Sequence, residues 1–398
     1  MIIQSDKYGI GSGLPSLVGQ SLRKLRANEP ATGIEFGYDG VDVINVEEAR
    51  SDIRSTTRAG YSVYDSYPGL QALIDAAGNY KVFYFPANGI FNLSNNVVTK
   101  SQGQHFTSAG CGAGIKNGGF SLLHEYSGAS NLYLFGEETY GIYVAPGTGT
   151  TLGPQTENRF SVLGGIDFFN PIYLSNLHIA DKQYGIYNNY RMMYGRVDRV
   201  RITECNTAGV YISMLDSIYD WGDWNFSQME ITKCQVGMHI VKAGGTRIVN
   251  SKIQSCLSSG LLLEPTTAVS SSTVQGTYIT GSCFEDNAGN DVKITAQTGV
   301  ASSKYPQNTV IVGGTIHKLV LDKCNFVSLV GVYTNMQITQ NITATNVVFI
   351  GCPASREIRT GSGTSYLDMG MDSAMGAYIK VGSRLTLIDS LNPSGKYL

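Results

Sequence analysis

A cysteine-centred pattern that returns along the chain restricts the fold more than any other sequence feature. In five of its six occurrences an apolar residue stands three positions before the cysteine, and the cysteines follow one another at intervals of 29, 22, 27, 41 and 28 residues. A glycine and a short apolar strand follow each of the first four cysteines. The six segments are Ile202–Cys205, Ile231–Cys234, Ile253–Cys256, Thr280–Cys283, Leu321–Cys324 and Phe349–Cys352. A unit of this size cannot bury its apolar side alone, so the pattern indicates a solenoid of stacked units.

We predict from this repeat an all-β chain folded as a right-handed parallel β-helix. Equivalent positions in successive coils would lie at the strand spacing of ~4.8 Å, which would align the cysteines as a column of buried thiols. A leucine-rich repeat fits less well, because its fixed LxxLxL spacing is absent. The cysteines and histidines show no zinc-ligand spacing, so we expect no metal site and no cofactor.

Composition agrees with strands and tight turns and argues against some partners. Only 15% of the 398 residues are charged, against a usual share of roughly 25%, while glycine (47) and tyrosine (24) are abundant. A net charge of -2 gives no support for nucleic-acid or membrane-surface binding. No run approaches the ~20 apolar residues of a membrane span, and Met1–Lys7 turns polar too soon for a secretory signal. We therefore expect synthesis in the cytoplasm and no membrane insertion.

The chain divides into three predicted segments. Residues 1–60 form an N-terminal segment of uncertain fold, 61–355 form the β-helix with its entry helix, and 356–398 break the repeat as a C-terminal cap or subunit-contact segment. Tyr67–Gly78 is predicted to be a short helix, with proline at its start and glycine at its end. Strands are predicted directly after it, at Val82–Pro86 and Gly89–Leu93. Such a helix would cap the exposed edge of the first coil.

This entry segment, a helix followed by Val82–Pro86 and Gly89–Leu93, resembles that of the pectate-lyase-like β-helix superfamily. Within it, residues of about 60–355 are similar to bacteriophage tailspikes and capsule depolymerases. The resemblance implies a virion protein of the phage tail, made in the host cytoplasm, that binds and cleaves a bacterial capsule or O-antigen polysaccharide as a homotrimer. Asp39 and Gly40 match the usual Asp-Gly motif only in part. The Asn-Thr-Asp, Asp-Asp and Gly-His-Gly motifs of the polygalacturonase branch are absent.

The long connections that follow the post-glycine strands should lie together on one side of the coils and wall a groove. The richest of them, Asp216–Trp224, holds three carboxylates and both tryptophans of the chain. Glycoside hydrolysis needs an acid and a second carboxylate as base or nucleophile, and an adjacent aromatic ring raises the pKa of an acid by excluding water. The alternative is a solvated acidic loop whose tryptophans pack over the coil. We predict as catalytic residues Asp220, Asp223 and Asp216, and as substrate-binding residues Tyr219, Trp221, Trp224, Tyr190, Arg191 and Lys242.

Three glutamates are further catalytic candidates, namely Glu204, Glu230 and Glu264. The positions four before successive cysteines are Arg201, Glu230 and Lys252, and they should stack outward as a ladder of alternating charge. Glu230 is therefore more readily explained as a neutralised ladder member than as a catalyst. Glu204 lies beside a turn cysteine, and Glu264 lies at the mouth of a long connection.

Two other functions remain open beside the hydrolase. Carboxylates dominate the candidate site, which favours hydrolysis over elimination. A non-catalytic β-helix that binds a glycan receptor would use the same groove. A polysaccharide lyase would instead need a base and a cation for a uronate, for which Tyr190, Arg191 and Lys242 are available.

Overall fold

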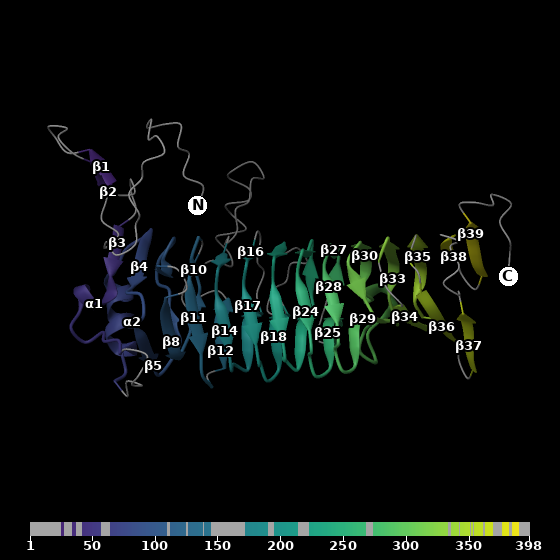
Figure 1. The fold of residues 1–398 in the computed structure, drawn as a ribbon, viewed down its shortest axis with the longest axis horizontal. Helices are drawn as coiled ribbons and strands as arrows, with labels where there is room; N and C mark the ends of the chain where they lie inside the picture. Colours follow the sequence, from purple (N-terminus) through teal and green to yellow (C-terminus); the bar gives the residue numbers. More distant parts are fainter. Residues whose placement is uncertain are drawn as a thin grey trace.

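The computed structural model places a single elongated stack of β-coils along one axis (Figure 1). Within the described part of the chain, no helix is long and apolar enough to cross a membrane. The structure describes residues 25–27, 34–36, 42–56, 64–109, 112–124, 126–137, 139–144, 172–189, 195–213, 223–267, 274–332, 336–341, 343–350, 352, 354–360, 363–368, 376–381 and 384–389.

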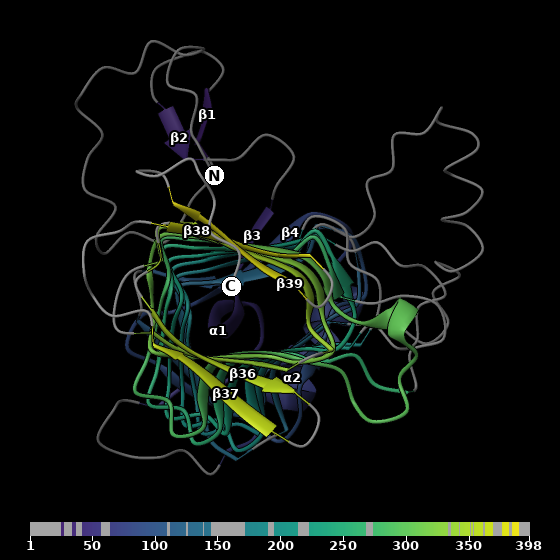
Figure 2. The ribbon, with the colours of Figure 1, turned by 90° about the vertical axis from the view of Figure 1, so that its right-hand side faces the viewer.

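Three sheets form the sides of the stack, and each full coil gives one strand to each sheet in turn (Figure 2). Sheet 1 comprises, in spatial order, β3 (Asp42–Asn45), β4 (Lys81–Phe85), β7 (His105–Ser108), β10 (Gly128–Ser130), β13 (Tyr173–Ser175), β16 (Gly195–Asp198), β19 (Trp224–Ser227), β23 (Arg247–Val249), β27 (Tyr278–Thr280), β30 (Gln307–Val312), β33 (Asn325–Val330), β35 (Thr345–Ile350), β38 (Gly376–Val381) and β39 (Arg384–Asp389), with β22 (Ala243–Gly244) and β26 (Val274–Gln275) beside it.

Sheet 2 comprises β5 (Ile90–Leu93), β8 (Ala113–Asn117), β11 (Leu132–Phe135), β14 (His178–Ala180), β17 (Arg201–Thr203), β20 (Glu230–Thr232), β24 (Lys252–Gln254), β28 (Cys283–Glu285) and β31 (Thr315–Ile316). Sheet 3 comprises β6 (Val97–Val98), β9 (Phe120–Leu122), β12 (Tyr140–Val144), β15 (Tyr184–Asn188), β18 (Ala208–Ile212), β21 (Val236–Ile240), β25 (Ser259–Leu263), β29 (Asn290–Ile294), β32 (Lys318–Leu321), β34 (Met336–Asn341), β36 (Ala354–Thr360) and β37 (Gly363–Asp368).

The coils pair in parallel as far as β36, which confirms the predicted right-handed parallel β-helix. Antiparallel pairing begins at the C-terminal end, where β37 folds back on β36 and β38 on β35. The remaining elements are β1 (Leu25–Ala27), β2 (Ile34–Phe36), α1 (Val46–Ala49), α2 (Tyr67–Ala76) and the 3-10 turn η2 (Ser302–Lys304).

Helix α2 caps the N-terminal end of the stack, as predicted from Tyr67–Gly78. Its apolar face buries Leu70 and Ile74 against the core. On the same helix the Gln71 amide accepts a hydrogen bond from the Val98 N–H (2.8 Å) and donates one to the Val98 carbonyl (3.0 Å). The helix therefore satisfies the backbone N–H and carbonyl of Val98 in β6, the first strand of sheet 3.

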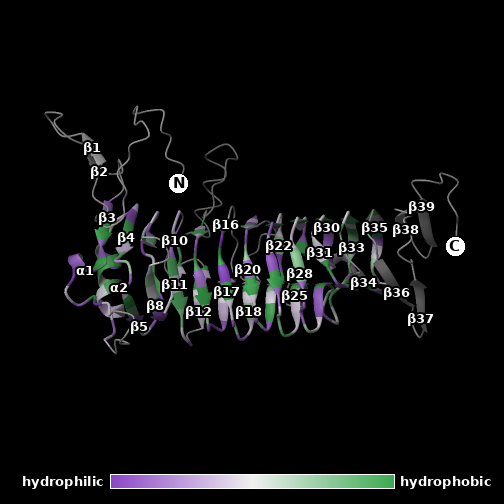
Figure 3. Ribbon diagram, in the orientation of Figure 1, coloured by the Kyte–Doolittle hydropathy of each residue, from purple (hydrophilic) through white to green (hydrophobic). Residues whose placement is uncertain are grey.

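Stacked apolar residues fill the interior, and the alternation of apolar and polar residues along the strands is visible in Figure 3. One column on sheet 2 illustrates the packing, because each member pairs with its counterpart in the next coil and is fully buried. Its members are Ile179, Ile202, Ile231, Ile253 and Phe284. The core is therefore continuous along the axis, as expected for a solenoid.

The predicted cysteine row is only half correct. Cys205, Cys234 and Cys256 do stack at the turn between sheets 2 and 3, since each backbone carbonyl accepts a hydrogen bond from the following coil. In the next coil Asn287 takes the cysteine position and its side chain accepts from the Cys256 N–H (2.9 Å). Cys283 instead begins β28 opposite Lys252. Cys324 and Cys352 lie in other turns, before β33 and after β35. All six of these cysteines are free thiols.

The glycine that follows the turn between sheets 2 and 3 has a steric role. At Gly237 an added Cβ would lie 2.4 Å from the carbonyl oxygen of Gly260 in the next coil and 2.4 Å from a methyl group of Ile253. Gly185 and Gly209 are enclosed in the same way. The turn therefore brings the chain too close to the next coil for any side chain.

We expect Gly237→Ala to lower the free energy of unfolding by about 1–3 kcal/mol, because backbone rather than a flexible side chain must move. Gly78→Ala is the matched control, since nothing lies within 4 Å of an added Cβ there. Thermal unfolding followed by circular dichroism measures both. Equal transition temperatures for Gly237→Ala and the unsubstituted protein would contradict this close packing.

Candidate functional site

Long connections leave the stack where sheet 3 returns to sheet 1, and we call this corner the 3–1 edge. The passage from β29 to β30 there contains η2, which projects to the right in Figure 2. By contrast, the turn from β17 to β18 on the opposite side runs only from Thr203 to Ala208. The described candidates on the 3–1 edge are Asp223, Lys242 and Glu264. Six candidates lie outside the described residues: Tyr190, Arg191, Asp216, Tyr219, Asp220 and Trp221.

Asp223 is a half-buried carboxyl group at the start of β19. Its side chain lies against Gly245 of the next coil, where an added Cβ would come 1.9 Å from Asp223 Oδ1. Removal from water raises the pKa of Asp223 and the charge of Arg247 opposes that shift, with desolvation the larger effect. A carboxyl group that holds its proton more readily than usual is what a general acid requires.

Trp224 does not contact solvent, which contradicts its predicted role in sugar binding. Its side chain is fully buried in the core and stacks on Phe226, with ring centroids 5.4 Å apart. The ring also covers Gly195 in the preceding coil, where an added Cβ would lie 2.5 Å from the indole. Because the sequence holds β19 in register with β16, Trp224 points inward and fills the space left by that glycine.

Lys242 is likewise enclosed, with only 1% of its surface exposed. Burial of the side chain contradicts the prediction that Lys242 binds substrate. Lys242 lies on the 3–1 edge as predicted, in the connection between β21 and β22, but its side chain is buried there.

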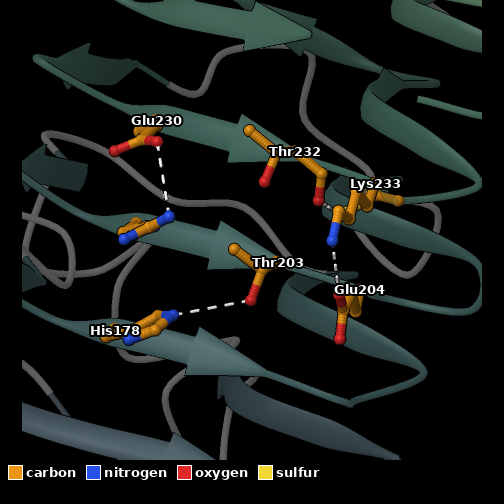
Figure 4. A network of polar contacts seen from close by, with 8 residues as sticks. His178, Thr203, Glu204, Glu230, Thr232 and Lys233 are labelled. Carbon is orange, nitrogen blue, oxygen red and sulfur yellow. Dashed lines mark hydrogen bonds and ion pairs between the residues drawn. The ribbon is translucent and has the colours of Figure 1, made fainter. Parts of the chain in front are cut away.

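Glu230 lies on sheet 2 in β20, and Glu204 lies in the turn that follows β17 (Figure 4). Neither residue is in a connection from sheet 3 to sheet 1. Glu230 lies 3.7 Å from Arg201, and Glu204 accepts a hydrogen bond from Lys233 at 3.1 Å. The pairing of Arg201 with Glu230 and of Glu230 with Lys252 confirms the predicted ladder. These exposed ion pairs neutralise both glutamates and place them apart from Asp223 and Glu264.

Glu264 follows β25 and is partly exposed. Its Oε2 lies 3.7 Å from Nε2 of His239, on the neighbouring coil. Desolvation lowers the pKa of His239 to about 4, so the imidazole is neutral at pH 7 and this contact is not an ion pair there. The negative charge of Glu264 also contributes to raising the pKa of Tyr211, after desolvation and Tyr184.

A row of aromatic side chains on the outer face of sheet 3 leads to Glu264. In register across four coils, one column runs through Tyr143, Tyr187, Tyr211 and His239. Tyr187 and Tyr211 are nearly parallel, with centroids 5.3 Å apart, and Tyr211 meets the His239 ring edge-on at 5.1 Å. Together with two flanking tyrosines, this column forms what we call the tyrosine tract, comprising Tyr140, Tyr143, Tyr184, Tyr187, Tyr211 and His239.

The tyrosine tract was not predicted, although the sequence carries a signal for it. The tetrapeptide Tyr-Gly-Ile-Tyr occurs at Tyr140–Tyr143 and again at Tyr184–Tyr187. Gly209–Tyr211 repeats its glycine and its last tyrosine, with valine in place of isoleucine. The glycine is the second residue of its strand in each case, and the tyrosine two positions later points outward from that strand. Aligning the glycines would have stacked the tyrosines.

Comparison with solved structures finds several β-helix proteins that resemble this chain. ORF18 of Geobacillus virus E2 is 12% identical with a TM-score of 0.46, covering 86% of this chain and 68% of that one. The tailspike of E. coli bacteriophage HK620, in complex with a pentasaccharide, is 11% identical with a TM-score of 0.43 (84% and 67%). The mannuronan C-5 epimerase AlgE4 A-module of Azotobacter vinelandii is 14% identical with a TM-score of 0.38 (79% and 77%).

No family model matches the chain, and no curated protein matches it. The chain is thus similar in structure to phage tailspikes and to an epimerase module. Likeness at these identities and TM-scores assigns no activity, so the function has to be argued from the site itself.

We expect acid to destabilise the fold partly through two histidines. Desolvation lowers the pKa of His105 and of His239 to about 4, below the unfolded value of about 6.5. The unfolded chain therefore binds more protons between these values, and stability falls as the pH decreases from 6.5 to 4. Each ring contributes about 2 kcal/mol of this loss at pH 5.

Denaturant unfolding of the unsubstituted protein and of His239→Gln at pH 7.5 and pH 5 measures this effect. The variant should lose less stability between the two pH values than the unsubstituted protein. The same loss in both proteins would show that His239 is not held neutral by the fold.

Proposed function

We propose that this protein is a tailspike-type β-helix of a phage virion that binds a bacterial surface polysaccharide, capsule or O-antigen, and cleaves it by glycoside hydrolysis. The observation that carries the proposal is the carboxyl group of Asp223, half-buried on the 3–1 edge with a raised pKa. As for tailspikes, we propose synthesis in the host cytoplasm and assembly as a homotrimer.

In this proposal Asp223 is the general acid. Its proton passes to the glycosidic oxygen as the bond from that oxygen to the anomeric carbon breaks, and water supplies the hydroxyl group that the anomeric carbon gains. A second carboxylate acts as base or nucleophile. The candidates for it are Asp220 and Asp216, from the connection that leads into Asp223, and Glu264 on the same edge. The distance between the two carboxyl groups would decide whether the product retains or inverts its configuration.

The tyrosines on sheet 3 do not favour elimination. A lyase needs a base that loses its proton readily, but desolvation raises the pKa of Tyr187 to about 12 and raises that of Tyr140 and Tyr211. These phenols stay protonated near neutral pH and serve as hydrogen-bond donors. The same donors would equally suit a non-catalytic glycan-binding protein, which is the second candidate function.

We expect Asp223→Asn to reduce the rate of polysaccharide cleavage at least ~100-fold, since an amide cannot donate the proton. Asp286→Asn is the matched control, because Asp286 is exposed in the turn after sheet 2 and its positive φ of 56° suits asparagine. Release of reducing ends from the host polysaccharide measures both variants. Full activity of Asp223→Asn would remove Asp223 from the mechanism.

The reaction products distinguish a hydrolase, a lyase and a non-catalytic glycan-binding protein. A hydrolase releases reducing ends without ultraviolet absorbance from an unsaturated uronate, whereas a lyase produces both signals. Binding of the host polysaccharide with neither signal would contradict the catalytic proposal and leave the glycan-binding function.

A further inference from the structure

The tyrosine tract is a polar aromatic surface without charge. The strands that present it, β12, β15, β18 and β21, contain no Lys, Arg, Asp or Glu. Its one ionisable ring besides the phenols, that of His239, is neutral at pH 7 because burial lowers its pKa to about 4. At the His239 end of the tract lies the carboxyl group of Glu264, 3.7 Å from the imidazole.

The tract follows the axis of the β-helix rather than forming a compact patch. Four rings of one column occupy successive coils, so their span is roughly 14 Å at three strand spacings. The near-parallel pairs Tyr143–Tyr187 and Tyr187–Tyr211 cover each other's faces, which turns ring edges and hydroxyl groups outward. A surface of this shape suits an extended chain.

Several of its hydroxyl groups are available to a ligand. Tyr143 donates to Asn189 over a long 3.5 Å, and Tyr187 contacts Ser213. We find no hydrogen bond from the hydroxyls of Tyr140, Tyr184 and Tyr211 within the described residues, and all three side chains are partly exposed. Sugars offer many hydroxyl oxygens, which can accept hydrogen bonds from a row of outward-facing phenol hydroxyls.

We propose that the tyrosine tract binds a neutral stretch of the polysaccharide, laid along the helix axis and leading to Glu264 and the 3–1 edge. The charge pattern of the four strands β12, β15, β18 and β21 favours a neutral ligand. A uronate stretch would find no cation on these four strands to neutralise it and would meet the Glu264 carboxylate at the end of the tract. The inference rests on the proposed function, since it names the substrate class for the same site.

The test measures binding with cleavage disabled. Asp223→Asn protein is applied to a panel of purified neutral O-polysaccharides and uronate-containing capsular polysaccharides, immobilised at equal mass. The tightest binding should be to a neutral member and should be unchanged when the salt concentration is raised, because no ion pair is involved. Tightest binding to a uronate-containing member, or to no member, would overturn the proposal.

Substitutions in the same background locate the binding surface. Tyr187→Ala and Tyr211→Ala should each weaken binding at least about tenfold. Tyr211→Phe, which keeps the ring, should weaken it about fivefold through loss of the hydroxyl. The matched control is Tyr133→Ala, which removes a ring stacked on Phe135 and His178 on the outer face of sheet 2 and should leave binding unchanged.

Unchanged binding in both alanine variants would overturn the tract as the binding surface. So would a change of oligomeric state in these variants, measured by light scattering, because it would show that a second copy of the chain covers the tract. Cleavage by the unsubstituted protein is measured separately. The proposal for the tract can therefore be refuted while hydrolysis through Asp223 is still observed. Conversely, the catalytic role of Asp223 can be refuted while the tract still binds polysaccharide.

Discussion

Parallel pairing between successive coils is the constraint on which the rest of the structure depends. Because the pairing holds each residue over its counterpart, a single type of side chain repeated at one position becomes a continuous column. Isoleucines on the inner face of sheet 2 become the core, and tyrosines on the outer face of sheet 3 become a tract. The same pairing sends the long connections out at one corner, which places Asp223 and Glu264 on the same edge.

The fold could be predicted because its signals are local and repeated. Two features define the strand and the turn within one coil. They are the apolar residue three positions before the cysteine and the glycine after it, and both occur at Cys205, Cys234 and Cys256. The prediction failed where a cysteine occupies another position of the coil. The predicted row includes Cys283, although Thr280 replaces the apolar residue three before it. Asn287 holds the equivalent position, because a side-chain amide can also satisfy that turn.

The candidate site could be predicted only in part, because the direction of a side chain at a loop boundary depends on the neighbouring coil. Asp223 and Trp224 are adjacent in the sequence, but their side chains point in different directions because each lies against a glycine of a neighbouring coil. These glycines are Gly245 for Asp223 and Gly195 for Trp224. The indole fills the space over one glycine inside the core, while the carboxyl group rests against the other on the edge. Nothing in the local sequence around Asp223 indicates either glycine as its neighbour.

A crystal structure of the Asp223→Asn protein with an oligosaccharide prepared from the host polysaccharide is the most direct measurement. We expect the sugar chain to follow the tyrosine tract on sheet 3, with a glycosidic oxygen within hydrogen-bond distance of residue 223. Sugar bound instead over the charged ladder of Arg201 and Glu230 on sheet 2, with residue 223 free of contact, would contradict this location of the site.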